Sequence, residues 1–124
     1  MSNKLPVMAD AELAVMELLW VNDVLTAPEI RGQLYPDDTP TSTGTVQKLL
    51  QRLEKKGFIS RDRTHFVHFF RAKVARQEYA GEQLASLAKK LTKGSLVPFI
   101  THLVEAKKLS AKERKEIADL LKRK

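Results

Sequence analysis

The chain has 124 residues, of which 43% are hydrophobic and 30% are charged, a composition typical of a folded globular protein rather than a disordered one. It contains no cysteine, which excludes disulfides, thiolate metal sites and thiol redox switches. The formal net charge of +7 favours a polyanionic partner, either nucleic acid or an acidic membrane surface.

The N-terminal sequence and the apolar runs indicate the compartment in which the protein is expected. Residues 1–10 lack a cationic stretch followed by an apolar run, so we expect no export signal. The apolar-rich stretches at 13–21 and 96–104 contain polar residues and are too short to span a bilayer. We therefore expect a cytoplasmic protein with no membrane partner.

The first 40 residues predict two helices and a short strand. Apolar residues at helical spacing predict a helix over 9–20, with Leu13, Met16 and Trp20 on one face. Residues 24–26 indicate an edge strand, and Pro28 stands early in a predicted helix over 27–35. The prolines and aspartates of residues 35–40 predict a turn.

The clearest helix is predicted from residue 42 or 43 to residue 56. Val46, Leu49, Leu50 and Leu53 share one face, and Gly57 ends the helix. The β-prone runs 58–63 and 66–71, on either side of the polar segment 62–65, predict a hairpin. Three helices followed by a hairpin are the order of a winged helix-turn-helix.

Three further helices are predicted after a hinge at 72–76. The first lies around residues 80–91 and ends before Gly94, and the second spans the apolar positions from 96 to 104. The last opens with a capping box made by Ser110 and Glu113. We expect a mainly α fold with a flexible N-terminus at 1–8, a winged-helix DNA-binding domain at 9–74 and a helical dimerisation domain at 75–124.

The positive charge is concentrated in the helix and hairpin of the predicted winged helix. Residues 1–40 contain two Lys or Arg and seven Asp or Glu, whereas residues 41–76 contain nine and two. Residues 77–124 contain eleven and six. A cationic segment of this kind is typical of a surface that faces phosphates.

If the leucines of the helix ending at 56 face the core, its outer face is uncharged polar or positive. Glutamine can pair with adenine, and lysine and arginine reach guanine or phosphate, so this face has the side chains of a major-groove helix. Gly44 would allow close approach of the backbone, with hydroxyls beside it, and basic residues of the hairpin would contact phosphates or enter the minor groove. The predicted DNA contacts are Thr41, Ser42, Thr43, Gly44, Gln47, Lys48, Gln51, Arg52, Lys55, Arg61, Arg63 and His65, with Arg71, Lys73 and Arg76 extending the patch.

The apolar residues after position 75 exceed what a helical appendage buries against one small domain. A symmetric dimer would cover them, and a self-contained three-helix core in a monomer is the alternative. The residues predicted to form the dimer contact are Leu84, Leu87, Leu91, Leu96, Phe99, Ile100, Leu103, Ile117, Leu120 and Leu121.

Functions other than sequence-specific DNA binding are compatible with parts of this sequence. The polar helix face is also compatible with a solvated face, with a winged helix that binds an acidic protein, or with non-specific nucleic-acid binding. An enzyme is not expected, because the chain has three scattered histidines and no glycine-rich phosphate loop. No cofactor or metal is expected, because His65 and His68 would fall on opposite faces of a strand.

Several strings resemble the penicillinase-repressor family, which includes methicillin-resistance and copper-responsive repressors. The strings are AELAVM at 11–16, LW at 19–20, LTAPEI at 25–30, GTVQKLLQRL at 44–53 and KKG at 55–57, with residues 94–96 and 103–110 similar to the family's dimerisation region. The resemblance implies a homodimeric repressor on a palindromic operator. It also implies DNA reading by Thr45, Gln47, Lys48, Gln51 and Arg52 and by the hairpin residues Arg61 and Arg63.

The chain departs from this family in three places. The copper-responsive branch uses a C-terminal cysteine cluster, so copper sensing by that site is excluded. Gly44 stands where the family usually has serine, which removes a contact and favours a different operator preference. His102 and Leu103 stand where the family's cleaved Asn-Phe bond lies, so induction by cleavage there is not expected, and His102 is expected to be a partly buried residue of the dimer contact. The sequence identifies no upstream sensor or protease.

Overall fold

The computed structural model describes residues 5–37 and 40–123 and divides into two compact units, Met1–Gln83 and Leu84–Lys124. The first unit contains α1 (Asp10–Val21), β1 (Leu25–Thr26), α2 (Ala27–Leu34), α3 (Pro40–Lys56), β2 (Ile59–Asp62), β3 (Phe69–Ala72) and the start of α4 (Arg76–Leu91). The second contains the rest of α4, α5 (Val97–Glu105) and α6 (Ala111–Leu121). The mainly helical winged-helix fold is confirmed.

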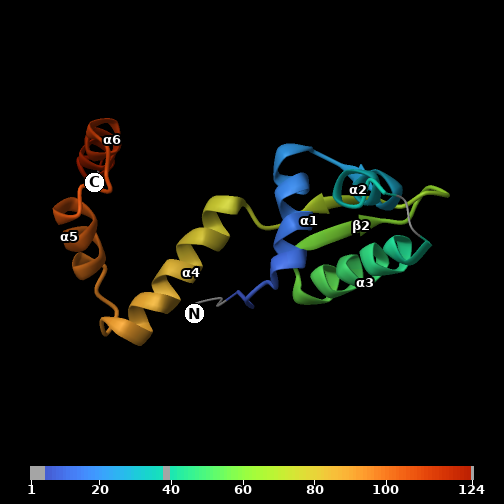
Figure 1. Ribbon diagram of the computed structural model, residues 1–124, viewed down its shortest axis with the longest axis horizontal. Coiled ribbons are helices and arrows are strands. Elements are labelled where there is room, and N and C mark those ends of the chain that lie inside the picture. Colours follow the sequence, from blue (N-terminus) through green and yellow to red (C-terminus); the bar gives the residue numbers. More distant parts are fainter. Residues whose placement is uncertain (1–4, 38–39, 124) are drawn as a thin grey trace. The chain divides into compact units, whose positions relative to one another are not determined.

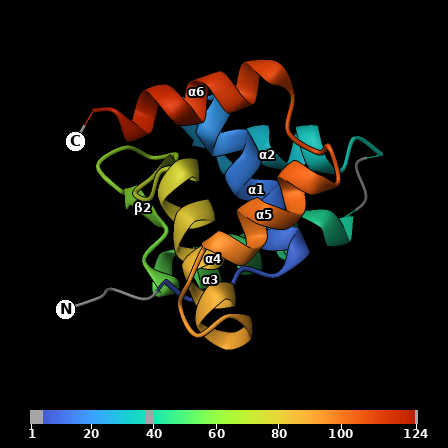
Figure 2. The same ribbon diagram turned by 90° about the vertical axis from the view of Figure 1, so that its left-hand side faces the viewer.

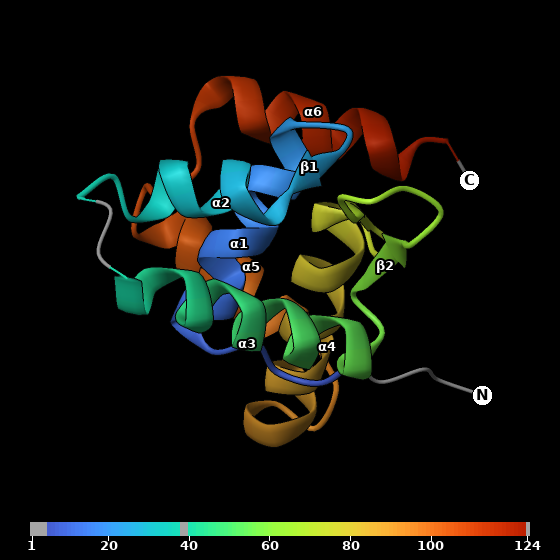
Figure 3. The ribbon, with the colours of Figure 1, turned by 90° about the vertical axis from the view of Figure 1, so that its right-hand side faces the viewer.

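The sheet of the first unit has three antiparallel strands in the order β1-β3-β2. Leu25 pairs with Phe70, and Ile59 pairs with Ala72, so β3 is the central strand. Helices α1, α2 and α3 pack on one another, and α1 and α3 also contact the sheet (Figure 1). Figure 3 shows α1, α2 and the long α3 together.

The core of the first unit is closed. Apolar side chains from α1, α2, α3 and the sheet fill it, and Leu50, Leu53, Phe58 and Phe70 are at most 1% exposed. Burial of large apolar side chains is the main stabilising contribution to such a domain. Trp20 on α1 adds a hydrogen bond, because its indole Nε1 donates to the carbonyl of Val74 at 2.8 Å.

A Schellman motif ends α3 at Gly57. The N–H of Phe58 donates to the carbonyl of Leu53 at 2.9 Å, and the N–H of Gly57 donates to the carbonyl of Glu54 at 3.1 Å. Gly57 has φ = 87°, in the left-handed region that glycine adopts without steric cost. The motif turns the chain directly from α3 into β2, so this strand of the wing begins next to the end of α3 and contacts the helix.

The predicted element boundaries differ from the structure at three places. Helix α3 begins at Pro40 rather than at residue 42 or 43, because proline has no N–H to lose at the first helical position. The strands are β2 and β3 rather than 58–63 and 66–71, so residues 63–68 form the loop of the wing. Met8, expected in a flexible terminus, is buried in the core, and its N–H donates to the Tyr79 hydroxyl at 2.8 Å.

In the second unit, α5 and α6 are two short amphipathic helices joined by the turn after Glu105 (Figure 2). Neither helix contains a buried residue. Ser110 caps α6, since its Oγ accepts from the N–H of Glu113 at 3.0 Å and the Glu113 carboxylate accepts from the N–H of Ser110 at 3.0 Å. The unit boundary falls within α4, after Gln83, whereas the sequence placed the hinge at 72–76.

Candidate nucleic-acid interface

The outward face of α3 is a continuous polar surface. Val46, Leu49, Leu50 and Leu53 turn into the core, as the spacing predicted. The exposed residues of this helix are Thr41, Thr43, Gly44, Thr45, Gln47, Lys48, Gln51, Arg52 and Lys55. Lys48, Arg52 and Lys55 form no ion pair with any described residue, so their charges are available to a partner.

The first turn of α3 corrects one predicted contact. Ser42 is 5% exposed and faces the core, because it lies four residues before Val46 and seven before Leu49 on the same helix face. Thr45 is exposed, but its hydroxyl donates to the Thr41 carbonyl at 3.1 Å. At Gly44 a Cβ would meet nothing within 4 Å, so the backbone of this turn lies open to a ligand.

Arg61, predicted as a phosphate contact, packs against the protein instead. Its side chain is 12% exposed, and its guanidinium lies over the Phe70 ring at 4.8 Å from the centroid. Its Nε lies 3.3 Å from Oε1 of Glu54, an ion pair without a hydrogen bond. Arg61 therefore supports the base of the wing, because β2 pairs it with Phe70 on the inner side of the hairpin.

Arg63 shares the carboxylate of Glu54 with Arg61. Its Nη2 donates to Oε2 of Glu54 at 3.1 Å, and its side chain remains 58% exposed. One oxygen of Glu54 thus pairs with the nearly buried Arg61, and the other pairs with the exposed Arg63. The contact ties the wing to the C-terminal half of α3.

The loop of the wing is shaped by Asp62. Its Oδ1 accepts from the Thr64 hydroxyl at 2.7 Å and from the Thr64 N–H at 2.9 Å, and these hydrogen bonds lower the pKa of the Asp62 carboxyl. His65 is exposed and lies edge-on to Phe69, with ring centroids 5.4 Å apart. Phe66 follows it as a fully exposed side chain, at 101%.

Acidic residues outside the cationic segment neutralise part of the predicted patch. Arg71 pairs with Asp23 at 3.3 Å, and Arg76 pairs with Glu17 at 2.8 Å while lying over the Trp20 ring. Lys73 is exposed. The free positive charge is therefore centred on α3 rather than spread evenly over residues 41–76.

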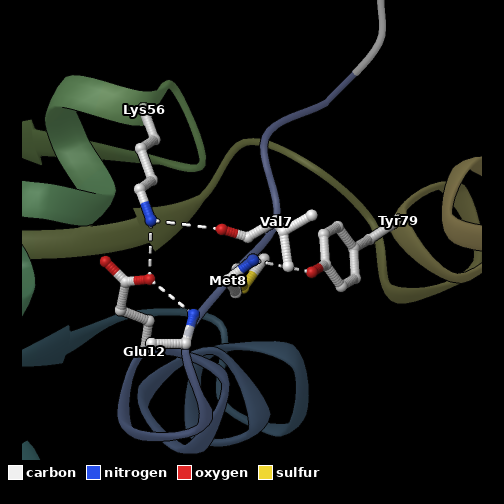
Figure 4. A network of polar contacts seen from close by, with 6 residues as sticks. Val7, Met8, Glu12, Lys56 and Tyr79 are labelled. Atoms are coloured by element: carbon white, nitrogen blue, oxygen red, sulfur yellow. Dashed lines mark hydrogen bonds and ion pairs between the residues drawn. The ribbon is translucent and has the colours of Figure 1, made fainter.

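A buried carboxylate fixes the far end of α3 (Figure 4). Glu12 is 1% exposed, and its Oε1 accepts from Lys56 Nζ at 2.7 Å and from the Ala9 N–H at 2.7 Å. Burial raises the pKa of this carboxyl, but the hydrogen bonds from Lys56 and Ala9 and the charges of Lys56 and Arg52 outweigh it, so the pKa is lowered. Glu12 was not predicted from the sequence to have this role, although a glutamate three residues into a helix is a capping signal.

The second unit carries an apolar groove of about 760 Å³. Seven of the ten residues predicted for the dimer contact line it, namely Leu84, Leu96, Phe99, Ile100, Leu103, Ile117 and Leu121. Leu87, Leu91 and Leu120 do not line it, although they are exposed. His102, expected to be partly buried, is exposed at the groove in the single chain.

Residues 5–37 and 40–123 offer no membrane span or metal cluster. None of their helices combines the length and apolar character needed to cross a bilayer. They contain no group of three or more His, Asp or Glu side chains placed to hold a metal ion. The polar face of α3 with the wing, and the apolar groove, are the features that a function has to explain.

Known proteins match the chain over almost all of its length. The sequence profile described as penicillinase repressor matches residues 8–123. A penicillinase repressor of Bacillus licheniformis is 27% identical over 118 residues, covering 95% of this chain and 91% of that protein. The methicillin resistance regulatory protein MecI of Staphylococcus aureus (strain N315) is 28% identical over 126 residues, with both chains covered completely.

A solved structure matches part of the fold. The solution structure of the DNA-binding domain of the repressor BlaI superposes with a TM-score of 0.53 and 29% sequence identity, covering 63% of this chain and 94% of that domain. The family profile spans both units described above. The chain belongs to the penicillinase repressor family, whose members are winged-helix, DNA-binding transcriptional repressors rather than enzymes.

Proposed function

We propose that the protein is a cytoplasmic repressor that binds a palindromic DNA operator as a homodimer, with α3 in the major groove and the wing on the backbone. The observation that carries this proposal is the outward face of α3. It exposes Gln47, Lys48, Gln51 and Arg52 on consecutive turns of one helix, and none of them is an acid. Glutamine, lysine and arginine are the side chains that read adenine and guanine edges in the major groove.

The ends of α3 support this docking. Gly44 leaves the backbone of the first turn open, and the N-terminus of a helix attracts an anion such as phosphate. At the other end, Lys56 is held by Glu12, so the helix is fixed to α1 while its outer face remains free. A recognition helix anchored on its inner face keeps its side chains in register with the groove.

The apolar groove supports the dimer. Apart from Thr92 and His102, its lining is apolar, and a single chain leaves Ile100 and Leu96 more than 40% exposed. A second copy would cover this surface with a matching one, because a two-fold interface brings the same residues together from both chains. Two copies of α3 would then meet half-sites about 34 Å apart.

Binding to the DNA upstream of the gene that encodes this protein tests the proposal. We would titrate that DNA and a scrambled duplex at two salt concentrations, with the wild type and with Lys48→Ala/Arg52→Ala. The matched control is Lys112→Ala/Lys115→Ala, which removes the same charge from exposed positions on α6. We expect tight, competitor-resistant binding of the upstream DNA, lost in the α3 variant and kept in the α6 variant.

The alternatives give different results. Equal, salt-sensitive binding of both duplexes would indicate non-specific nucleic-acid binding. No binding of any duplex would favour a winged helix that contacts an acidic protein. Equal losses in the two double variants would show that net charge, and not the face of α3, determines binding.

A further inference from the structure

Glu54 is the only acidic residue of α3, and both of its oxygens face the wing. Oε2 accepts from Arg63 at 3.1 Å, and Oε1 lies 3.3 Å from Arg61. Arg61 is fixed over Phe70 and nearly buried, so its contact is part of the fold. Arg63 is more than half exposed, so its pair is the weak, exchangeable kind.

The carboxylate of Glu54 presents to Arg63 what a DNA phosphate would present. Both are anionic oxygens that accept a charge-assisted hydrogen bond from a guanidinium. An arginine bound to Glu54 is restrained and its charge is partly neutralised, so its contact with a phosphate is weaker than that of a free arginine. The pair competes directly with any phosphate that reaches the wing.

We propose that Glu54 is a specificity-determining residue that holds Arg63 away from the phosphates of random DNA. This inference rests on the proposed function, since it assigns a role within the same DNA-binding surface. Binding to random DNA depends almost wholly on phosphate contacts, so an internal competitor for one arginine weakens it directly. On the operator, base contacts from α3 would fix the register of the helix, and the wing would reach the backbone through the exposed Thr64 and His65 while Arg63 stays on Glu54.

Asp62 provides the matched control for this role. It is the other acid among residues 41–76 and lies on the same hairpin, but its carboxylate accepts from Thr64 and not from an arginine. Glu54→Gln and Asp62→Asn each remove one negative charge with little change in shape. An effect of charge alone would be similar in the two variants.

The experiment measures affinity for the upstream DNA and for a scrambled duplex between 50 and 200 mM salt. We expect Glu54→Gln to bind scrambled DNA more tightly at low salt and to bind the operator with a smaller gain. One added phosphate contact steepens the salt dependence by about 0.9 in logarithmic slope, so the gain shrinks about 3.5-fold over this salt range. Asp62→Asn should raise both affinities by one common, smaller factor.

Arg63→Gln provides the second arm. In the double variant Glu54→Gln/Arg63→Gln, the gain for scrambled DNA and the steeper salt slope should disappear, because no arginine is left to release. A gain that persists without Arg63, or an equal gain in Asp62→Asn, would overturn the inference and leave only net charge. Absence of DNA binding by the wild type would instead refute the proposed function, so the two failures are distinguishable.

Discussion

The two units of this protein bury their apolar residues to very different degrees. In the first unit, large side chains such as Phe58, Phe70 and Leu50 are at most 1% exposed. In the second, Ala88 is the only buried residue among those described, and Leu121 is 75% exposed. Helices with the same amphipathic pattern thus form a closed core in one unit and an open groove in the other.

The difference follows from what each helix packs against. Helices α1, α2 and α3 pack against one another and against the sheet, and this packing buries their apolar faces. Helices α5 and α6 have 9 and 11 residues, which is short for stability without packing. The first unit closes its core, whereas the second leaves its groove open, and the proposed second copy would cover it.

The largest effect that sharpens this comparison is expected from Leu50→Ala. Leu50 is fully buried in α3, so the change should lower the free energy of unfolding by about 2–5 kcal/mol through lost burial and a cavity. Chemical denaturation at two protein concentrations measures the loss. Val21→Ala, at a position 76% exposed, should change the same quantity by no more than about 0.5 kcal/mol.

Ile100→Asn should act on the dimer rather than on the first unit. Ile100 lines the groove and is 42% exposed in one chain, so the amide would be buried only when a second copy covers it. An unsatisfied buried amide costs roughly 1–3 kcal/mol and occurs twice in a symmetric dimer, so the dissociation constant should rise by about 30-fold or more. Sedimentation equilibrium measures it, with Val21→Asn as the exposed control, and a variant as dimeric as the wild type would contradict the two-fold use of the groove.

The Glu12–Lys56 pair predicts a smaller effect with a defined pH dependence. The pKa of Glu12 is lowered in the folded protein, so its contribution to stability is complete above its ordinary value of 4.5 and is lost as the pH falls through the lowered value. Lys56→Met removes the hydrogen bond, and burial then raises the pKa. We expect a loss of about 1–3 kcal/mol at neutral pH and a smaller loss in acid, where Glu12 is protonated.

Denaturation of wild type, Lys56→Met and Glu12→Gln between pH 7 and pH 3 measures this dependence. Lys48→Met is the control, because it makes the same chemical change on the exposed face of α3. Equal destabilisation by Lys56→Met and Lys48→Met, or a Lys56→Met loss that is constant with pH, would contradict the role assigned to the pair.

Periodicity was enough to predict the helices, the hairpin and the outer face of α3. The leucine spacing from Val46 to Leu53 fixes which side of that helix is buried, and the remaining side follows from 100° per residue. The same rule puts Ser42 on the core side, but Ser42 was predicted as a DNA contact because the helix was expected to begin only at residue 42 or 43. Including the turn that begins at Pro40 would have identified Ser42 as an inward-facing residue.

The contacts of charged residues were not predictable in the same way. Glu54 and Arg63 are nine positions apart on different elements, and Lys56 and Glu12 are 44 positions apart. Charge counts along the sequence treat such residues as unpaired. They therefore overstated the positive charge that Arg61 and Arg71 add to the DNA-binding surface. Pairing across elements depends on tertiary structure, and no local pattern encodes it.

Removing one helix cap from each unit should give the smallest effect on stability, and it compares the two units through the same chemical change. Thr26 caps α2 in the first unit, with Oγ1 accepting from the N–H of Glu29 at 3.3 Å, and Ser110 caps α6 in the second. Replacing either with alanine should cost about 1 kcal/mol. In Thr26→Ala this loss should lower the free energy of unfolding of the first unit and leave the dimer dissociation constant unchanged.

In Ser110→Ala the loss should appear in the dimer, because α6 is stabilised there by the second copy. About 1 kcal/mol in each chain corresponds to about a 30-fold rise in the dissociation constant, since two caps are lost in each dimer. Sedimentation of the two variants beside thermal unfolding separates the quantities. If Ser110→Ala instead lowers the stability of a monomer and leaves its association unchanged, the second unit folds without a partner, and the open groove is then a surface for some other ligand.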